Sequence, residues 1–528
     1  MQFDYDAIVI GSGFGGAVTA CRLAEHQMKV LVLERGRRWE PEDYPRTPDA
    51  PWLWSNDIPE KLNGWLDLRE FRNMWVATGA GVGGGSLIYA NVFVEAKPEA
   101  FATGWPAQIT YSGLAPYYQR AGLMMDAQEL PQGQHTARLN MMLEAAEKAG
   151  VQQRFRKLPL AVQFNPSWNY QDYRPGDYSG SKESTNPHGK KQGTCVHCGE
   201  CDIGCKVRAK NTLDLNYLAV AESNGAEIRA LHRVVCIEPE ADGYRVHYED
   251  LAQGRRRRAN TTSKRVIVAA GSIGSTELLL RCRDQYRTLP RLSHYLGNGW
   301  SSNGDFLTPA FYSDREIDPT QGPTITCAID FLDNSADGQA VFVEDGGFPD
   351  LLNDFLRRGL SRPHIGLERP FWHDLAKLTD AQNPLKNVMP WFGQGVDAAD
   401  GQLLLKRKWY KPWQRDLCMN WNPARSMAMI DALIQKHQTF STLTGGTAWV
   451  PPTWSLAKML VTPHPLGGCG MGTTQQNGVV DHRGEVFAYP NLYVADGSIV
   501  PHALGLNPSR TIAALAERIA EGICASGS

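Results

Sequence analysis

A glycine-rich turn between two short apolar runs constrains this chain more than any other feature. The run Ala7–Ile10 is typical of a buried parallel strand, a helical pattern follows the turn, and a second apolar run, Val30–Leu33, ends in Glu34. This order predicts a βαβ unit that binds a dinucleotide. Each of the three glycines of the motif has a physical reason. Gly11 permits a tight turn, Gly13 lets the backbone approach a pyrophosphate, and Gly16 allows close helix–strand packing.

The helix that opens inside this turn would supply oriented N–H groups and positive potential to the phosphates of the dinucleotide. The carboxylate of Glu34 would accept hydrogen bonds from the ribose hydroxyls. The motif by itself does not distinguish FAD from a nicotinamide dinucleotide. The predicted cofactor-binding residues of this unit are Gly11, Gly13, Phe14, Gly15, Gly16 and Glu34.

A second glycine cluster, Gly79–Ser86, favours a flavin, because its small residues let a flat, bulky ring lie against the backbone. A glycine-rich surface loop is the alternative interpretation of this cluster. The predicted cofactor-binding residues are Gly81 and, as the lining of an isoalloxazine ring, Gly83, Gly84 and Ser86.

The composition limits the class of protein and its partners. The 528 residues suffice for two or three domains, and 54 Lys and Arg balance 56 Asp and Glu, so charge makes no strong case for nucleic acid. No run supplies the roughly 20 apolar residues that a membrane span needs. The N-terminus is acidic and lacks a signal-peptide pattern, which predicts a cytoplasmic protein. The odd number of cysteines, 11, argues against a disulfide framework.

The order of the patterns predicts an α/β fold with a doubly wound, Rossmann-like FAD-binding domain and an inserted α+β substrate domain. Residues 1–300 and 456–528 would form the FAD-binding domain, which includes a cysteine-rich loop at 190–210. Residues 301–455 would form the substrate domain on an antiparallel sheet, because alternating segments such as Ala340–Glu344 occur there. A helical pattern at Ser509–Ile523 would close the first domain.

Four residues in the C-terminal part of the chain are candidates for chemistry. His464 lies in the turn Pro463–Cys469, which would hold an imidazole rigidly, although a lone histidine is more often structural. Asn507 precedes the closing helix, where a turn or cap role is the alternative. Asp496 and Gly497 follow a predicted strand and could place an N–H group near a cofactor.

Together these motifs resemble the glucose–methanol–choline oxidoreductase family, and within it the bacterial cholesterol oxidases and similar proteins. The resemblance spans Tyr5 to Glu521 and is carried by five segments: Gly11–Gly16, Gly79–Ser86, Ala270–Ser275, His464–Cys469 and Asp496–Pro508. It implies an α/β flavoprotein that holds FAD, covalently or not, and oxidises an alcohol. It places Asp496 and Gly497 beside the flavin and the backbone of Val234 near the adenine.

The resemblance also implies the roles of three catalytic positions. His464 and Asn507 match the catalytic pair, in which the histidine takes the hydroxyl proton and the asparagine positions the alcohol oxygen. Glu344 aligns with a glutamate that moves a proton during double-bond isomerisation of a sterol. The expected substrate is a 3β-hydroxysteroid or a similar apolar alcohol, and a peripheral contact with the membrane that supplies it stays open.

Four cysteines in 11 residues predict a metal centre in addition. The spacing Cys195-x2-Cys198-x2-Cys201-x3-Cys205 is that of a ferredoxin-type iron–sulfur site of the 4Fe-4S or 3Fe-4S kind, except that Lys206 replaces the usual proline. Zinc and reduced structural cysteines are the alternatives. A cluster would give the flavin an outlet other than oxygen, to an acceptor protein or a quinone. Two further functions therefore stay open, a sugar or long-chain-alcohol dehydrogenase and an electron-transfer flavoprotein.

Overall fold

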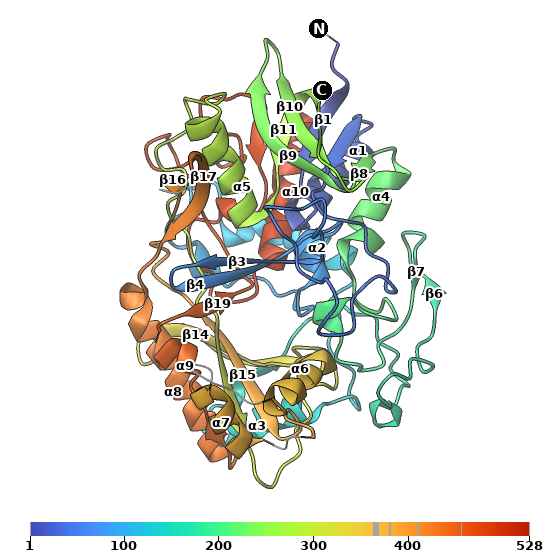
Figure 1. Ribbon diagram of the computed structural model, residues 1–528, viewed down its shortest axis with the longest axis vertical. Helices are drawn as coiled ribbons and strands as arrows, with labels where there is room; N and C mark the ends of the chain where they lie inside the picture. Colours follow the sequence, from blue (N-terminus) through green and yellow to red (C-terminus); the bar gives the residue numbers. More distant parts are fainter. Residues whose placement is uncertain (1, 363–368, 380–381, 409–410, 456, 527–528) are drawn as a thin grey trace.

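The structure is a computed structural model that describes residues 2–362, 369–379, 382–408, 411–455 and 457–526. Figure 1 shows two layered regions, one above the other, with both termini at the top of the upper region. The upper region contains a mixed sheet with helices on its faces. The lower region contains a second, antiparallel sheet. The α/β fold class and the presence of a Rossmann-like unit are confirmed.

The upper sheet has seven strands in the order β8-β2-β1-β11-β10-β9, and β20 also pairs with β11. β1, β2, β8, β11 and β20 pair in parallel, whereas β9 and β10 are antiparallel. The apolar runs of β1 and β2 are buried, as strands covered on both faces require. The strands are β1 (Tyr5–Ile10), β2 (Val30–Leu33), β8 (Glu227–Arg229), β9 (His232–Pro239), β10 (Tyr244–Asp250), β11 (Arg257–Val268) and β20 (Leu492–Val494).

Helices from both ends of the chain cover this sheet. α1 packs against α10 and α4, and α10 also packs against α2, so the C-terminal helix returns to the βαβ unit that opens the chain. The helices of this region are α1 (Phe14–Glu25), α2 (Tyr111–Met124), α4 (Tyr217–Ser223), α5 (Gly271–Leu280) and α10 (Ser509–Ala525). The two ends of the chain thus lie in one region, and the division into domains at residues 300 and 456 stays a prediction.

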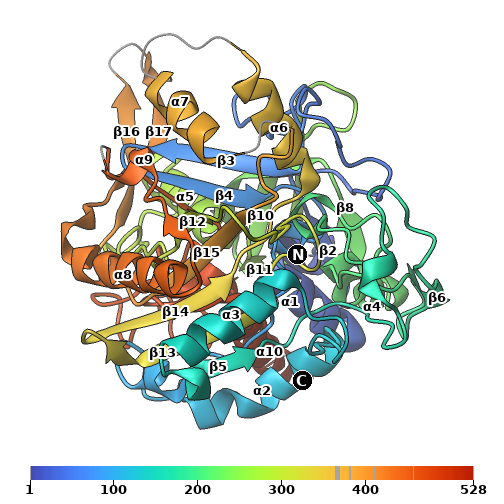
Figure 2. The ribbon, with the colours of Figure 1, turned by 90° about the horizontal axis from the view of Figure 1, so that it is seen from below.

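The lower sheet is antiparallel throughout, in the order β18-β12-β15-β14-β13-β5. Helices α3 and α8 pack against it (Figure 2). β5 and α3 come from residues before 160, a contribution that a domain limited to 301–455 leaves out. The elements are α3 (Ala137–Lys148), β5 (Phe155–Lys157), β12 (Phe306–Phe311), β13 (Cys327–Ala336), β14 (Gln339–Asp345), β15 (Val388–Gly395), α8 (Met427–Leu443) and β18 (Thr447–Ala448).

Smaller elements join and flank the two regions. A three-stranded sheet in the order β19-β4-β3 lies between them (Figure 1), and the hairpin of β16 and β17 packs beside α5. These elements are β3 (Leu66–Phe71), β4 (Met74–Gly79), β6 (Ser184–Thr185), β7 (Lys191–Gln192), α6 (Asp350–Leu360), α7 (Arg369–Leu378), β16 (Gln402–Lys408), β17 (Lys411–Asn420), α9 (Pro452–Ser455) and β19 (Leu460–Thr462).

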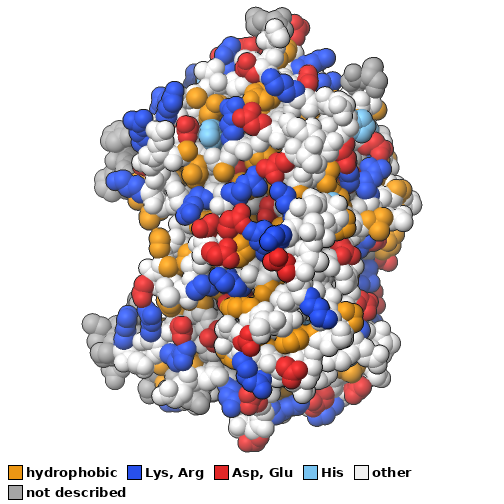
Figure 3. Space-filling model, turned by 90° about the vertical axis from the view of Figure 1, so that its right-hand side faces the viewer, with side chains coloured by type: hydrophobic (Ala, Val, Ile, Leu, Met, Phe, Trp, Pro, Cys, Tyr) orange, Lys and Arg blue, Asp and Glu red, His pale blue; other side chains and the backbone are white. Residues whose placement is uncertain are grey.

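The length of the helices and the charge of the surface relate to two predictions, the cellular location and the kind of partner. Among the described residues, no helix is both long and apolar enough to cross a membrane, and the cytoplasmic location stays a prediction. On the face that carries β6 and β7, basic and acidic side chains are intermixed and hydrophobic ones are scattered (Figure 3). Neither sign of charge dominates this face, which agrees with the near balance of charges in the sequence.

Candidate active site

The first glycine turn has the geometry that its sequence predicts. Gly11 has a φ of +95°, in the left-handed region, and a Cβ on Gly16 would lie 2.0 Å from the Gly11 carbonyl oxygen. These two glycines therefore serve the turn and the packing of α1 on β1. Gly13 differs, because a Cβ there would meet no atom closer than 3.9 Å. Gly13 also lines the main cavity, so its backbone is accessible to a ligand.

The end of β2 supplies the acidic group of this unit. The Glu34 carboxylate accepts hydrogen bonds from the Ser12 N–H at 3.0 Å, the Ser12 hydroxyl at 2.7 Å and the Gly36 N–H at 2.9 Å. These donors fix the carboxylate beside the glycine turn, and Glu34 lines the main cavity. The chain thus holds an acceptor where a ribose would lie.

The second glycine cluster places some of its residues at the cavity and others behind it. Gly84 and Gly85 line the cavity, and a Cβ on Gly85 would meet nothing within 4 Å. Ser86 is buried and bonds the Gly83 carbonyl, while a Cβ on Gly81 would meet the ring of Trp39. Gly81, Gly83 and Ser86 therefore shape the turn, and Gly85, which the sequence interpretation omitted, borders the open space.

The other expected cofactor residues lie along the same cavity. Val234, on β9, and Asp496 and Gly497, after β20, are part of its lining. The Asp496 carboxylate accepts hydrogen bonds from the Gly271 N–H and from the hydroxyls of Ser275 and Ser498. Asp496 therefore joins two turns of the cavity wall. These residues fit an extended dinucleotide such as FAD.

A single large cavity of about 1570 Å³ runs from the glycine turns to the lower sheet. His464 and Asn507 line it together with Gly13 and Gly84. The part that approaches the lower sheet is largely apolar, with walls from Leu307, Ile325, Phe348, Phe392 and Val461. The two positions predicted to be catalytic are thus brought into the cavity that the dinucleotide turns open onto.

His464 is held by a carboxylate that the sequence interpretation missed. Its Nδ1 lies 2.9 Å from Oδ1 of Asp305, which is completely buried just before β12. The Thr462 hydroxyl lies 2.6 Å from the other oxygen of Asp305 and accepts the backbone N–H of His464 at 3.0 Å. Asp305 lies 159 residues before His464, so no local pattern connects the two.

Glu344 contacts Asn507, which lines the cavity, but is not itself part of the lining. It is completely buried on β14, and the Gln394 amide donates to its Oε2 at 2.7 Å. Burial raises the pKa of the Glu344 carboxyl well above its usual range, and hydrogen bonds from Gln394 and Asn507 oppose that rise. The structure thus brings the Glu344 carboxyl to Asn507, at a buried position that favours its protonated form.

A buried amide network ties this group to the fold. The Asn303 side-chain N–H groups donate to Oε1 of Gln394 and to the Leu506 carbonyl. Its Oδ1 accepts the N–H groups of Leu504 and Gly505, so the chain just before Asn507 is held by the lower sheet. Asn303 and Gln394 carried no signal in the sequence, because each lies in a segment with no recognisable motif.

The cysteine loop gathers its four thiols without forming a site for a single ion. Cys195 and Cys201 are buried, and Cys198 and Cys205 are half-buried. Burial raises the pKa of the Cys198 thiol, and the nearby charges of the other three cysteines raise it further. Among the described residues, no group of three or more His, Cys, Asp and Glu side chains could hold a metal ion. The iron–sulfur cluster and the zinc alternative are not shown.

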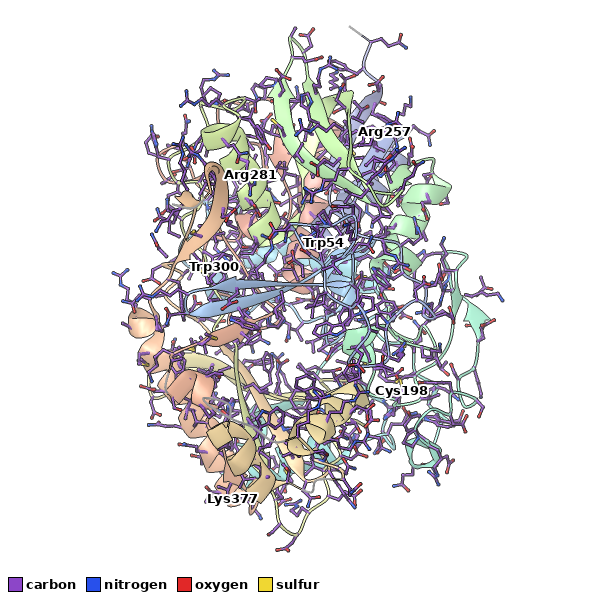
Figure 4. The ribbon with its side chains drawn as sticks, in the orientation of Figure 1. Trp54, Cys198, Arg257, Arg281, Trp300 and Lys377 are labelled. Carbon is purple, nitrogen blue, oxygen red and sulfur yellow. The ribbon has the colours of Figure 1, made fainter. Side chains whose placement is uncertain are left out.

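The cysteine loop contacts both halves of the molecule. The buried ammonium of Lys210 donates to the carbonyls of Cys201 at 2.6 Å and Leu87 at 2.9 Å, so it joins this loop to the segment after Gly84 and Gly85. On the other side, the Gly322 N–H donates to the His197 carbonyl at 2.9 Å. Figure 4 places Cys198 at the right of the molecule, near the level of α6.

Comparisons with known proteins decide the family. Two family models described as GMC oxidoreductase match residues 171–282 and 400–516, and a model described as NAD(P)-binding Rossmann-like domain matches residues 9–39. Across 98% of this chain and 94% of its own length, a cholesterol oxidase of Acinetobacter baumannii is 31% identical. The chain belongs to the GMC oxidoreductase family. A cholesterol oxidase of Mycobacterium tuberculosis (strain CDC 1551 / Oshkosh) is 32% identical over 98% of this chain and 91% of its own length.

A more distant relative in sequence and a solved structure of similar fold were also found. Long-chain-alcohol oxidase FAO1 of Arabidopsis thaliana is 24% identical over 98% of this chain and 67% of its own length. A formate oxidase structure from Aspergillus oryzae RIB40 superposes with a TM-score of 0.66, at 14% identity, over 100% of this chain and 99% of its own. As a GMC oxidoreductase with these features, the chain is an enzyme that oxidises an alcohol with FAD, rather than an electron carrier alone.

Proposed function

We propose that this enzyme oxidises a bulky apolar secondary alcohol of the 3β-hydroxysteroid class to the ketone. One observation carries the proposal: His464 and Asn507 line the same cavity as the dinucleotide-binding turns, which bear Gly13 and Gly84. An acid–base group, a polar positioning group and a cofactor site thus share one cavity.

The chemistry of the step assigns a role to each side chain. Bound FAD would accept the hydride from the carbinol carbon, which is the part of the reaction that belongs to the cofactor. His464 would take the hydroxyl proton at the ring nitrogen that faces the cavity. The Asn507 amide would hydrogen-bond the alcohol oxygen and so orient the C–H bond. The predicted substrate side lies toward Leu307 and Phe392, on the lower sheet.

The walls of the cavity support an apolar substrate. Aliphatic and aromatic side chains form the part near the lower sheet, and removal of apolar substrate surface from water stabilises binding by about 25 cal/mol per Å². The similarity to two cholesterol oxidases supports a sterol among the apolar alcohols. The similarity to a long-chain-alcohol oxidase keeps a long-chain alcohol as the second candidate.

Glu344 is the proposed proton carrier for double-bond isomerisation. A 5-ene ketone carries an acidified proton, and moving the double bond into conjugation needs a group that takes this proton and returns it two carbons away. A buried carboxyl with a raised pKa suits this exchange. Because Glu344 lies behind Asn507 and Gln394, this role requires a shift of their side chains when the ketone is bound.

The test is single-turnover reduction of the FAD-loaded enzyme by a 3β-hydroxysteroid, without oxygen. His464→Ala should slow flavin reduction roughly a hundredfold or more, the usual contribution of a general base. His26→Ala, an exposed histidine after α1, is the matched control and should reduce at the wild-type rate. Wild-type reduction by the His464→Ala enzyme would refute the assigned base. Reduction by long-chain alcohols but by no sterol would assign the second candidate.

Product analysis tests Glu344 separately. With a 5-ene sterol, Glu344→Gln should accumulate the 3-ketone whose double bond has not moved, while flavin reduction continues. Conjugated ketone formed at the wild-type rate would remove Glu344 from the mechanism.

We also propose that Cys195, Cys198, Cys201 and Cys205 hold an iron–sulfur cluster that takes electrons from the flavin. The spacing of the four cysteines, Cys195-x2-Cys198-x2-Cys201-x3-Cys205, is that of a ferredoxin-type site. Backbone N–H groups point at two of the sulfurs, from His197 to Cys195 at 3.4 Å and from Ala209 to Cys205 at 3.2 Å. Such donors stabilise cluster thiolates.

Metal analysis of anaerobically purified protein tests the cluster. Iron and acid-labile sulfide should be present, with a paramagnetic signal in one redox state, and Cys198→Ser should remove them. Cys327→Ser, a buried cysteine on β13, is the control and should retain both. Stoichiometric zinc without sulfide would refute the cluster. Peroxide formed in step with alcohol oxidation would identify oxygen as the acceptor in place of a protein or quinone.

A further inference from the structure

A buried carboxylate lies behind His464, on the side away from the cavity. Asp305 is completely buried, and its Oδ1 lies 2.9 Å from Nδ1 of the imidazole, which itself lines the cavity. We propose that Asp305 is the positioning residue that keeps the proton of neutral His464 on Nδ1 and leaves Nε2 as the acceptor for the alcohol proton. This inference rests on the proposed function, in which His464 is the base.

The contacts of Asp305 leave the imidazole little freedom. Oδ2 of Asp305 accepts from the Thr462 hydroxyl at 2.6 Å, and the same hydroxyl oxygen accepts the backbone N–H of His464 at 3.0 Å. Asp305 thus orients the ring through Nδ1, and Thr462 holds both the carboxylate and the backbone. A neutral imidazole has one donor and one acceptor nitrogen, so a carboxylate at Nδ1 makes Nε2 the acceptor.

The charges around this pair are few. Glu344, on β14, lies near enough for the charge of Asp305 to contribute to its raised pKa, which burial dominates. Asp345, the next residue, pairs with the fully buried Arg138 at 2.9 Å. The ring of His464 lies 2.9 Å from Asp305 and forms an ion pair with it only when the imidazole is protonated. An imidazolium at His464 therefore finds its compensating charge in Asp305.

In this arrangement His464 can accept the alcohol proton while Asp305 compensates the positive charge that forms. The alcohol O–H bond breaks and its proton moves to Nε2, while the hydride leaves the carbinol carbon for the flavin. The Nδ1 proton stays in its hydrogen bond to Asp305. The imidazolium that forms is paired at once, without movement of either side chain.

The first test compares Asp305→Asn with the wild type in anaerobic flavin reduction. The rate should fall by roughly tenfold or more, because the amide no longer compensates the imidazolium. A loss of structure alone would lower the rate without changing the tautomer of the His464 ring, which the ¹⁵N measurement below reports.

Asp397→Asn is the matched control. Asp397 is buried and accepts from Ser301 and Ser302 in the same chain segment, without contact to His464. Its replacement should leave the rate of flavin reduction close to that of the wild type. A wild-type rate in Asp305→Asn, or an equal loss of rate in Asp397→Asn, would overturn the inference.

A readout without substrate separates this inference from the proposed function. Ring ¹⁵N chemical shifts, assigned by difference from His464→Gln, should show Nδ1–H in the wild type and a mixture of tautomers in Asp305→Asn. Nε2–H in the wild type would overturn the inference even if His464→Ala is inactive. If His464→Ala reduces flavin normally, the proposed base fails, whereas the tautomer result still decides what Asp305 does.

Discussion

Alanine substitutions can distinguish two roles within the first glycine turn. Gly13 is expected to face the cofactor, whereas Gly16 allows α1 to pack against β1. In Gly13→Ala the new Cβ meets no protein atom closer than 3.9 Å, and a φ of −71° suits any L-residue. The flavin-free protein should keep its stability or gain up to about 1 kcal/mol from the reduced entropy of the unfolded chain. The same methyl fills the space of the pyrophosphate, which should cost about 1–3 kcal/mol of binding. FAD affinity should therefore fall about 5-fold to 150-fold.

Gly16→Ala should behave in the opposite way. Its Cβ would lie 2.0 Å from the Gly11 carbonyl oxygen, where ordinary contact begins at 3.4 Å, so α1 must move away from β1. The flavin-free protein should lose roughly 3 kcal/mol or more of stability. Thermal unfolding of flavin-free protein by circular dichroism and titration with FAD by fluorescence quenching measure the two effects. Wild-type FAD affinity in Gly13→Ala would refute the assignment of this turn to the pyrophosphate.

Two further predictions concern buried charges. Burial raises the pKa of the Glu344 carboxyl in the folded chain, so the unfolded chain releases this proton at a lower pH. The contribution of Glu344 to the free energy of unfolding therefore falls as pH rises above about 4.3. The Tm of Glu344→Gln should therefore exceed that of the wild type by a margin that grows with pH, and a constant margin would contradict the raised pKa. Arg138→Met should cost about 3–5 kcal/mol in urea unfolding, because it leaves the buried Asp345 carboxylate without its counter-ion. Arg154→Met, whose partner Asp333 is exposed, should cost less than about 1 kcal/mol, and equal losses would refute this reasoning.

Local patterns were sufficient for the elements that bind the dinucleotide. The turn from Gly11 to Gly16, the strand that ends in Glu34 and the helix α10 each depend on residues close in sequence. Their conformations follow from short-range rules on glycine, apolar periodicity and helix termini. The motif that carries His464 could also be found, because its glycines and prolines specify a rigid turn on their own.

Tertiary structure decided which groups surround His464 and Glu344. The Asn303 amide and the Asp305 carboxylate come from the segment before β12 and the Gln394 amide from β15, both far in sequence from His464, and each residue is ordinary in its local sequence. A buried polar group must find its partner wherever the packed sheets place one, since leaving it unpaired costs about 1–3 kcal/mol. Hydrogen-bond satisfaction in the core is a property of the whole packing. The sequence by itself therefore determined the dinucleotide unit and the candidate base, and only the packing of the second sheet against the C-terminal turn determined what holds that base in place.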